Sequence, residues 1–419
     1  MLSAPDTNRN GSFVPWEEPT VTRSTPIASA GFARRPDRPK CDTSDARPCS
    51  RDKQIIATWA KSDQDRFGAQ AVDGGPNRET RMTSSSSIWP IVLAGGEGRR
   101  MQSFIRSWLG EERPKQYCEF SGRRSMLGHT WDRARAMAPP DQVTTIVGRG
   151  HLQFLAGIEE PAPGTVIEQP ADRGTAPGIF LPTALVAARD PSATVVVMPS
   201  DHFIHPKADF IALAQAACRE AAEQPGKLVM LGARPLWPET DFGWILPAAP
   251  QHTLPLRPVA GFEEKPDRER AERFLAVGGL WNTMIVAARV DTLWRLGQRL
   301  LPQMMLPLDA LRRELRDSPE EAARAAIDRA ISRAYHRMPH ADFSRDLVQR
   351  CPEAALVLSL GNIEWSDWGR PERVAESLRR LGKKPAFRTR EASPILGGVL
   401  ISAPPGQPSV ASVVSAVQL

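Results

Sequence analysis

The chain has 419 residues and a mass of 46.1 kDa, with 41% hydrophobic and 24% charged residues. These proportions are those of a globular protein and exclude wholesale disorder, a collagen-like repeat and a coiled coil. Lys and Arg number 54 against 48 Asp and Glu, so the formal net charge is +6. Because both signs are interspersed along the chain, this excess fits an anionic small-molecule substrate at least as well as nucleic acid. With 2 Tyr and 14 Phe, little material exists for stacking on single-stranded bases, and we expect no nucleic-acid partner.

The cysteines are Cys41, Cys49, Cys118, Cys218 and Cys351. They form no C-x-x-C pair, which speaks against a disulfide framework and against a cysteine zinc site. The first residues lack the apolar run of a signal peptide, and no stretch of ~18 apolar residues that could span a bilayer occurs in the chain. We therefore expect a soluble cytoplasmic protein with no membrane partner.

The two ends of the chain differ in composition from its middle. Through Ser85, Leu, Ile, Val and Phe together number 10 of 85 residues, too few to bury the apolar surface that would offset the entropy of ordering. We predict that 1–86 is disordered, and one hypothesis is that translation begins near Met82. Residues 383–419 are rich in Pro, Ser, Gly and Val and are expected to form a loosely ordered tail.

Residues 87–382 are predicted to form one α/β domain, because apolar runs bounded by Gly, Pro and Asp alternate with segments of helical period. The first part predicts a Rossmann-like, mostly parallel sheet flanked by helices, with strands at 88–94, 144–147, 165–168, 194–198 and 228–232 and helices at 126–137, 175–188 and 208–223. Shorter strands follow and are expected to form a small inserted subdomain on the substrate side, at 242–246, 259–264 and 284–287, with a helix at 267–276. The domain is completed by a helical region at 291–334, a strand at 355–359 and a helix at 371–381.

The sequence IVLAGGEGRRM at 91–101 runs from a hydrophobic strand directly into Gly95, Gly96 and Gly98. Glycines after a strand let backbone N–H groups approach a phosphate or a flat base, since no Cβ intervenes. The loop is not a Walker loop, and it lacks the third glycine of a dinucleotide fingerprint. Alone it could equally be a tight turn. The segment RPKQ downstream favours a triphosphate site, because Lys115 beside the loop can hold a charged nitrogen over the phosphates.

Together these two segments resemble the signature of the sugar-1-phosphate nucleotidyltransferases, and most closely that of the mannose-1-phosphate guanylyltransferases. Similar motifs follow in the family's order: QPADRGTAPGI at 169–179, VMPSDHFI at 197–204, FGWI at 242–245, FEEKP at 262–266, LWNT at 280–283 and WSDWG at 365–369. The resemblance implies the nucleotidyltransferase fold and transfer of a nucleotidyl group from an NTP, GTP foremost, to a sugar 1-phosphate, mannose 1-phosphate foremost, with Mg²⁺ as cofactor.

Asp201 follows the buried run VVVMPS, at the carboxyl end of a strand, where the ligand sites of α/β sheets gather. A carboxylate there suits Mg²⁺, which takes oxygen ligands and bridges substrate phosphates; an N-cap or an ion pair is the structural alternative. By resemblance Asp367 is the second metal ligand, although its spacing alone does not decide this. His202 and His205 lack the partner ligands of a zinc site, so we expect them to be structural.

The resemblance also implies the substrate contacts. Arg100 and Lys115 would face the triphosphate. Lys265, which acidic neighbours keep protonated, would meet the sugar phosphate, and Glu264 would take sugar hydroxyls; a surface turn is the alternative for Lys265. The other implied sugar-binding residues are Gly243 and Asn282, and the implied nucleotide-binding residues are Ala94, Gly95, Gly96, Gly98, Gln169, Gly174 and Thr175.

The sequence departs from the family pattern at Arg99, where a threonine is usual, at Gly174, where an asparagine is common, and at Thr283-Met284 in place of Ser-Gly. Another NTP and hexose 1-phosphate therefore remain an alternative, as does a non-catalytic nucleotide-sugar-binding protein. A dinucleotide-dependent oxidoreductase is disfavoured, because GRG follows the strand at 144–147 where an acidic residue should hold ribose. The chain ends without the β-barrel isomerase domain of bifunctional relatives, so we expect transferase activity only. A homo-oligomer is left open.

Overall fold

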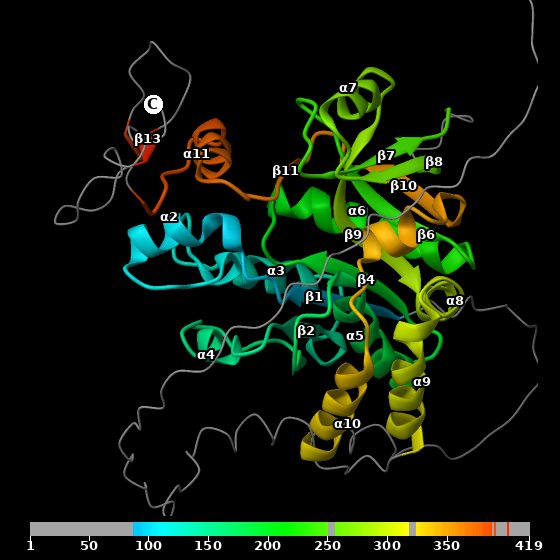
Figure 1. The fold of residues 1–419 in the computed structure, drawn as a ribbon. Helices are drawn as coiled ribbons and strands as arrows, with labels where there is room; N and C mark the ends of the chain where they lie inside the picture. The colour runs from blue at the N-terminus through cyan, green and yellow to red at the C-terminus, as the bar shows by residue number, and fades with distance from the viewer. Residues whose placement is uncertain (1–86, 250–255, 318–323, 388, 391–399, 402–419) are drawn as a thin grey trace, which may run out of the picture. The chain divides into compact units, whose positions relative to one another are not determined.

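The computed structural model describes residues 87–249, 256–317, 324–387, 389–390 and 400–401 (Figure 1). The segment 1–86, predicted to be disordered, lies outside the described residues, as does most of the predicted tail at 383–419.

Nine of the described strands form one mixed sheet, in the order β3-β2-β1-β4-β9-β6-β10-β8-β7 (Figure 1). Its parallel pairs join β1 (Ile88–Ala94), β2 (Thr144–Val147), β3 (Thr165–Glu168) and β4 (Thr194–Pro199), and also β6 (Leu228–Ala233) and β10 (Ala355–Ser359). Its antiparallel pairs involve β7 (Gly243–Pro247), β8 (Leu256–Glu264) and β9 (Leu280–Arg289). Two separate ribbons pair β5 (Phe203–His205) with β11 (Glu364–Ser366), and β12 (Thr389–Arg390) with β13 (Leu400–Ile401).

The strands predicted at 242–246, 259–264 and 284–287 extend this sheet. β9 is longer than predicted and lies in the middle of the sheet, antiparallel to β4 on one side and to β6 on the other. Every residue of β4 and β6 is buried, so the backbone N–H and C=O groups on the facing edges of these two strands need hydrogen-bond partners. β9 lies between the two strands and supplies these partners to both. The substrate-side strands are thus built into the same layer as the glycine-loop strand. The predicted α/β class with flanking helices is confirmed, but the sheet is mixed rather than mostly parallel, and the strands expected in an inserted subdomain belong to it.

Helices cover both faces of the sheet (Figure 1). One face carries α5 (Thr175–Arg189), α8 (Val290–Leu300), α9 (Pro302–Asp317) and α10 (Arg324–Arg337). The other carries α3 (Met126–Arg135), α6 (Lys207–Glu223) and α7 (Arg268–Ala276). The short helices are α4 (Leu152–Leu155), the 3₁₀ turns Lys115–Tyr117, Pro140–Gln142 and Pro352–Ala354, and the π-helical turn Phe343–Val348. In the described part of the chain, no helix has both the length and the apolar character needed to cross a membrane.

Two further helices, α2 (Arg99–Leu109) and α11 (Pro371–Arg380), share a smaller apolar cluster that also includes Phe387. The sequence-based predictions omit α2, because its start is hidden in the glycine loop, where Gly98 caps it at φ +62°. A helical signal is nevertheless present, since apolar residues recur three and four positions apart on one face. These residues are Met101, Phe104, Ile105 and Trp108.

Replacing Phe180 by alanine should destabilise the domain, because this α5 side chain is fully buried and packs against the rings of Trp294 and Phe343. Loss of a buried phenylalanine ring costs about 3–5 kcal/mol. Urea unfolding followed by tryptophan fluorescence measures the loss. As a control, Leu306→Ala on α9 removes a side chain that is 68% exposed and should change the free energy of unfolding by less than about 0.5 kcal/mol. Equal stabilities of the two variants would contradict this packing.

Candidate active site

Two strand ends form the base of the candidate site. β1 and β4 are parallel neighbours. Ser200, directly after β4, donates its backbone N–H and its hydroxyl to the carbonyl of Leu93, at 2.9 and 2.8 Å. Asp201 comes next, so its carboxylate emerges at the carboxyl edge of the parallel strands, the edge at which α/β proteins bind ligands.

Gln116 holds the glycine loop that follows β1. Its Nε2 donates to the carbonyls of Ala94 and Gly96, at 2.9 and 2.8 Å. The loop then approaches Lys115 closely, because a Cβ on Gly98 would lie 3.2 Å from the Cβ and from the backbone nitrogen of Lys115. Glycine is required at this position by both the close contact and the positive φ. The loop and the RPKQ segment therefore form one unit.

Gln169, directly after β3, closes the other side of the loop. A Cβ on Gly95 would come within 2.6 Å of the Gln169 Oε1, and the Gln169 Nε2 donates to the hydroxyl of Tyr335 on α10 at 3.0 Å. The structure thus brings together five of the residues predicted to bind nucleotide, Ala94, Gly95, Gly96, Gly98 and Gln169.

Lys115 is the buried cation of the site. Only 4% of its side chain is exposed, and its Nζ lies 3.0 Å from Oδ2 of Asp201. Nζ also donates to the backbone carbonyl of Asp367, which lies 252 positions further along the chain. The predicted partners Lys115, Asp201 and Asp367 therefore meet directly. Because an unpaired buried ammonium would be strongly destabilising, these contacts hold all three segments in place.

Both carboxylates of this group are ionised near neutral pH. Burial alone would raise the pKa of Asp201, but the charge of Lys115, the nearby His202 and the hydrogen bonds to the carboxylate together outweigh it and hold the pKa below its usual value. For Asp367, the charges of Lys115 and Arg373 and the hydrogen bonds from Gly369 and Arg373 together outweigh burial and lower the pKa. The neighbouring His202 is neutral, because burial lowers its pKa in spite of Asp201, and its Nδ1 accepts from the Trp365 indole at 3.3 Å.

Two arginines bind the side chain of Asp367 from different sides. Oδ1 accepts from Nη1 of Arg373 at 2.7 Å and from the backbone N–H of Gly369 at 3.0 Å. Oδ2 accepts from Nη2 of Arg100 at 3.0 Å. Arg100 donates in addition to Asp241 at 3.0 Å, so the predicted phosphate-binding arginine rests on two carboxylates.

The two aspartates fit a hard divalent cation. Mg²⁺ is bound in proteins through one or two carboxylates and completes its shell with water and substrate phosphates. Among the described residues, no group of three or more His, Cys, Asp and Glu side chains could form a complete protein cage for a metal, whereas Asp201 and Asp367 supply two ionised carboxylates. The side chain of Asp201 is 37% exposed, so an ion can reach it from solvent.

A second group of predicted residues lies where β7, β8 and β9 meet. A Cβ on Gly243 would come within 2.6 Å of Oε2 of Glu264 and within 3.2 Å of the Cβ of Asn282. The Asn282 Nδ2 donates to the hydroxyl of Ser344 at 3.2 Å. Oε2 of Glu264 is buried and has no hydrogen-bond partner among the described residues. Such an oxygen is costly to leave unsatisfied, and contact of Glu264 with a sugar hydroxyl stays a prediction.

Lys265 lies at the rim of this second group. Its Nζ is 3.7 Å from Oε1 of Glu264, and 58% of its side chain is exposed, so its ammonium is free to reach a ligand. It does not belong to the contacts around Lys115. The two groups are linked through the start of β7, because Asp241 pairs with Arg100 and Gly243 lies against Glu264.

Gly174 and Thr175, predicted to bind nucleotide, contact the segment 341–343. A Cβ on Gly174 would lie 2.4 Å from the carbonyl of Ala341. The Thr175 hydroxyl donates to Asp342 at 3.1 Å and accepts from the N–H of Phe343 at 2.8 Å. Asp342 also acts on the second group: burial raises the pKa of Glu264, the charge of Lys265 opposes this, and the charge of Asp342 adds to the rise. Contact of Gly174 and Thr175 with a nucleotide stays a prediction.

Several residues of the site are missing from the sequence-based predictions. Gln116 was detectable, because it belongs to the motif RPKQ, and so was Asp241, which directly precedes the motif FGWI. Arg373 lies four residues beyond the motif WSDWG, and no local pattern marks it. Nothing in the local sequence singles out Tyr335 or Glu239, whose partners are distant in the chain.

A glycine loop and a buried lysine at a strand end are features of proteins that bind nucleotide phosphates. Residues 89–381 match the protein-family model described as Nucleotidyl transferase. This match covers more than half of the chain, and the chain therefore belongs to the nucleotidyl transferase family. The resemblance inferred from the motifs is confirmed.

Curated relatives agree with this family. The chain is 35% identical over 206 residues to the xanthan biosynthesis protein XanB of Xanthomonas campestris pv. campestris (strain B100), covering 47% of this chain and 41% of that protein. It is 31% identical over 213 residues to the mannose-1-phosphate guanylyltransferase of Salmonella montevideo, covering 49% and 43%. The chain thus spans less than half the length of these two relatives.

Solved structures show the same fold. The structure of a protein named mannose-1-phosphate geranyltransferase from Thermus thermophilus superposes with a TM-score of 0.57 at 24% identity, covering 69% of this chain and 79% of that one. One named mannose-6-phosphate isomerase from Helicobacter pylori gives a TM-score of 0.51 at 18% identity, covering 67% and 99%. At these identities the likeness concerns the fold alone.

Asp367→Asn should lower the free energy of unfolding at pH 7 by about 2 kcal/mol, because buried Arg373 loses its charged partner. In the folded protein the pKa of Asp367 lies below its usual value of 3.8. Its stabilising contribution is therefore complete above that usual value and is lost as the pH falls through the lower folded-state pKa. The difference between variant and unaltered protein should shrink below about pH 4.

Urea unfolding at several pH values tests this expectation. Glu372→Gln, at an exposed position of α11, is the matched control and should behave like the unaltered protein. A stability difference for Asp367→Asn that stays constant at acid pH would show that the carboxylate charge does not hold Arg373.

Proposed function

We propose that this protein transfers a nucleotidyl group from an NTP, GTP foremost, to a sugar 1-phosphate, mannose 1-phosphate foremost, and releases pyrophosphate. The observation that carries the proposal is the meeting of Lys115, Asp201 and Asp367 at the carboxyl edge of the sheet. The family supports the type of reaction, and the names of the curated relatives support the choice of substrates.

The reaction needs positioning and charge stabilisation more than proton transfer. An oxygen of the sugar 1-phosphate attacks the α-phosphorus of the NTP, a new P–O bond forms, and the bond to the β-phosphate bridging oxygen breaks with pyrophosphate leaving. Because the attacking oxygen is already anionic, no general base is required. This chemistry accounts for the number of arginines and lysines around the site.

On the nucleotide side, the loop of Gly95, Gly96 and Gly98 lets phosphates or the base approach the backbone. Arg100 has a side chain that is 52% exposed, so it can turn from Asp367 to the triphosphate. Lys115 stays buried beside the loop and offers its charge at the edge where the phosphates enter. Mg²⁺, held by Asp201 and Asp367, would supply charge neutralisation between the nucleotide and the sugar phosphate.

On the sugar side, the unsatisfied Oε2 of Glu264 accepts a hydroxyl of the hexose, and Asn282 offers a donor and an acceptor beside it. Gly243 leaves room for the ring, because any Cβ there would fill the space next to Glu264. Lys265 reaches the sugar phosphate from the rim.

The described cysteines support the proposed cytoplasmic location. Cys118, Cys218 and Cys351 are free and buried, and burial raises the pKa of Cys118 and of Cys218 to about 12. Such thiols remain protonated and unreactive, which suits a protein kept in a reducing compartment.

Lys115→Ala and Asp201→Ala should each lower turnover by about 10²–10³-fold, because each removes a preorganised charge from the transition state. Pyrophosphate release in a coupled assay measures turnover, and circular dichroism checks the fold. Lys207→Ala removes an exposed lysine at the start of α6 and should leave the rate unchanged. Unaltered rates in either site variant would refute the assigned role.

Glu264→Gln should raise KM for the sugar 1-phosphate about tenfold and change KM for the NTP little, because a hydrogen bond to a charged acceptor is worth about 1.5–3 kcal/mol. The control Glu263→Gln alters the preceding residue of β8, whose side chain points to the other face and pairs with Arg270 at 2.5 Å. Equal KM values for the two variants would place the sugar elsewhere.

The substrates are identified by incubating the purified protein with each NTP and each hexose 1-phosphate, with and without Mg²⁺. We expect the fastest pyrophosphate release with GTP and mannose 1-phosphate, and none without the metal. Faster release with another pair would correct the substrates and keep the reaction. Binding of GDP-mannose without any pyrophosphate release would favour the non-catalytic alternative.

A further inference from the structure

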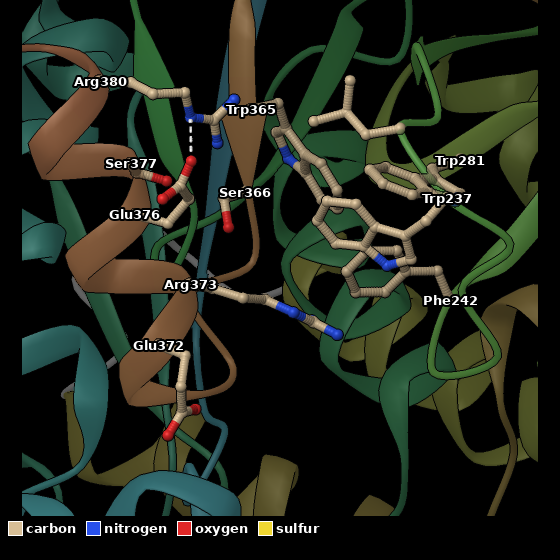
Figure 2. A pocket seen from close by; sticks show the side chains of 11 residues that line it. Trp237, Phe242, Trp281, Trp365, Ser366, Glu372, Arg373, Glu376, Ser377 and Arg380 are labelled. Carbon is tan, nitrogen blue, oxygen red and sulfur yellow. Dashed lines mark ion pairs between the residues drawn. The ribbon is translucent and has the colours of Figure 1, made fainter. Parts of the chain in front are cut away.

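Arg373 is a largely buried arginine that contacts three acidic side chains. It follows the motif WSDWG on α11, and 12% of its side chain is exposed. Nη1 binds Asp367 at 2.7 Å, Nη2 binds Glu239, and Nη2 also lies 3.8 Å from Asp241. Figure 2 shows the side chain reaching from α11 toward Phe242, and its guanidinium carbon lies 4.9 Å from the centre of that ring.

Glu239 fixes this guanidinium. Its side chain is 9% exposed. Its Oε1 accepts from the backbone N–H groups of Thr240 and Asp241, each at 3.0 Å. Its Oε2 accepts from the Trp237 indole at 3.0 Å and from Arg373. These donors fix the orientation of the Glu239 carboxylate. The Arg373 guanidinium is therefore held between Glu239, Asp367 and the ring of Phe242.

The two arginines on Asp367 differ in their freedom to move. Arg373 is buried and bound on three sides, so it remains on Oδ1. Arg100 on Oδ2 has 52% of its side chain exposed and is the cation proposed to turn to the triphosphate. When Arg100 leaves, Oδ2 becomes available while Oδ1 stays occupied by Arg373 and the Gly369 amide.

We propose that Arg373, fixed by Glu239, is a positioning residue that holds Asp367 so that only Oδ2 is presented to the divalent cation. The proposal rests on the proposed function, because it takes Asp367 as a metal ligand. A ligating carboxylate is normally oriented by an outer hydrogen-bond partner, and the loss of such a partner weakens metal affinity about 10–100-fold.

The same arginine also couples the metal side of the site to its sugar side. Glu239, Asp241 and Phe242 form the segment that leads into β7, and Gly243 at its end lies against Glu264. Since Arg373 contacts this segment and Asp367 together, a shift of either would move the other. Arg373 therefore sets the spacing between the carboxylate that binds the cation and the strand that meets the hexose.

The test measures binding of Mn²⁺ alone to the full chain by electron paramagnetic resonance, which requires no turnover. Arg373→Lys keeps the charge but cannot bridge two carboxylates in a plane, and we expect its Mn²⁺ affinity to fall about 10–100-fold. Glu239→Gln should weaken the affinity in the same direction, because Arg373 loses its charged anchor. Arg370→Lys, an arginine on Asp241 that does not contact Asp367, is the matched control and should bind Mn²⁺ like the unaltered protein.

Thermal unfolding of each variant separates positioning from general damage. Arg373→Lys should melt within a few degrees of Arg370→Lys while differing from it in Mn²⁺ affinity. Equal Mn²⁺ affinity of Arg373→Lys and the unaltered protein would overturn the proposal.

Asp367→Asn distinguishes failure of this inference from failure of the metal site itself. If Asp367→Asn and the unaltered protein bind Mn²⁺ alike, Asp367 is not a metal ligand, and both the inference and the metal role in the proposed function fall. If Asp367→Asn loses Mn²⁺ and Arg373→Lys does not, only the positioning role is refuted. Loss in both, with unchanged binding in Arg370→Lys, supports the proposal.

Discussion

The buried ammonium of Lys115 is the interaction on which the site depends. A cation removed from water needs negative partners in fixed positions, and here the partners come from the end of β4 and from the turn before α11. The chain must therefore place three distant segments correctly to satisfy one charge. Because Asp201 and Asp367 are also the carboxylates that fit a divalent ion, the contacts that stabilise this corner of the fold would also arrange the proposed chemistry.

The cations of the candidate site differ in exposure, and we relate this difference to the roles proposed for them. Lys115 and Arg373 are buried and hold carboxylates, whereas Arg100 and Lys265 are largely exposed and have room to swing toward phosphates. Buried charges keep their geometry because any movement would leave a partner unpaired in a region of low dielectric. Exposed charges lose little when they change partner, since water replaces what they leave. Lysine and arginine thus serve both as fixed partners of carboxylates and as exposed side chains that can change partner.

The sequence revealed most of the strands and helices because their apolar periods and their boundaries of Gly, Pro and Asp are local features. The motifs also brought Lys115, Asp201 and Asp367 together correctly. The sequence did not reveal that β9 enters the middle of the sheet, because strand pairing is decided by backbone groups far along the chain. Arg373 and Glu239 were overlooked for a related reason: a buried arginine has no local pattern, and its role is visible only when the carboxylates around it are placed. Gly174 and Thr175 lie in a stretch that resembles the family's motif, yet their contacts with 341–343 depend on a segment that sequence spacing does not connect to them.

The central position of β9 affects how the protein is made. During synthesis the strands β1 to β4 leave the ribosome first, but the open side of β4 has no neighbour until residues 280–289 emerge. For that interval a largely apolar strand, which is fully buried in the folded protein, exposes an unpaired edge, the kind of surface at which partly folded chains associate with one another. β10 then joins β6 only after a further helical segment has been added. The order of the strands along the chain thus leaves this edge of β4 unpaired until most of the sheet has been synthesised.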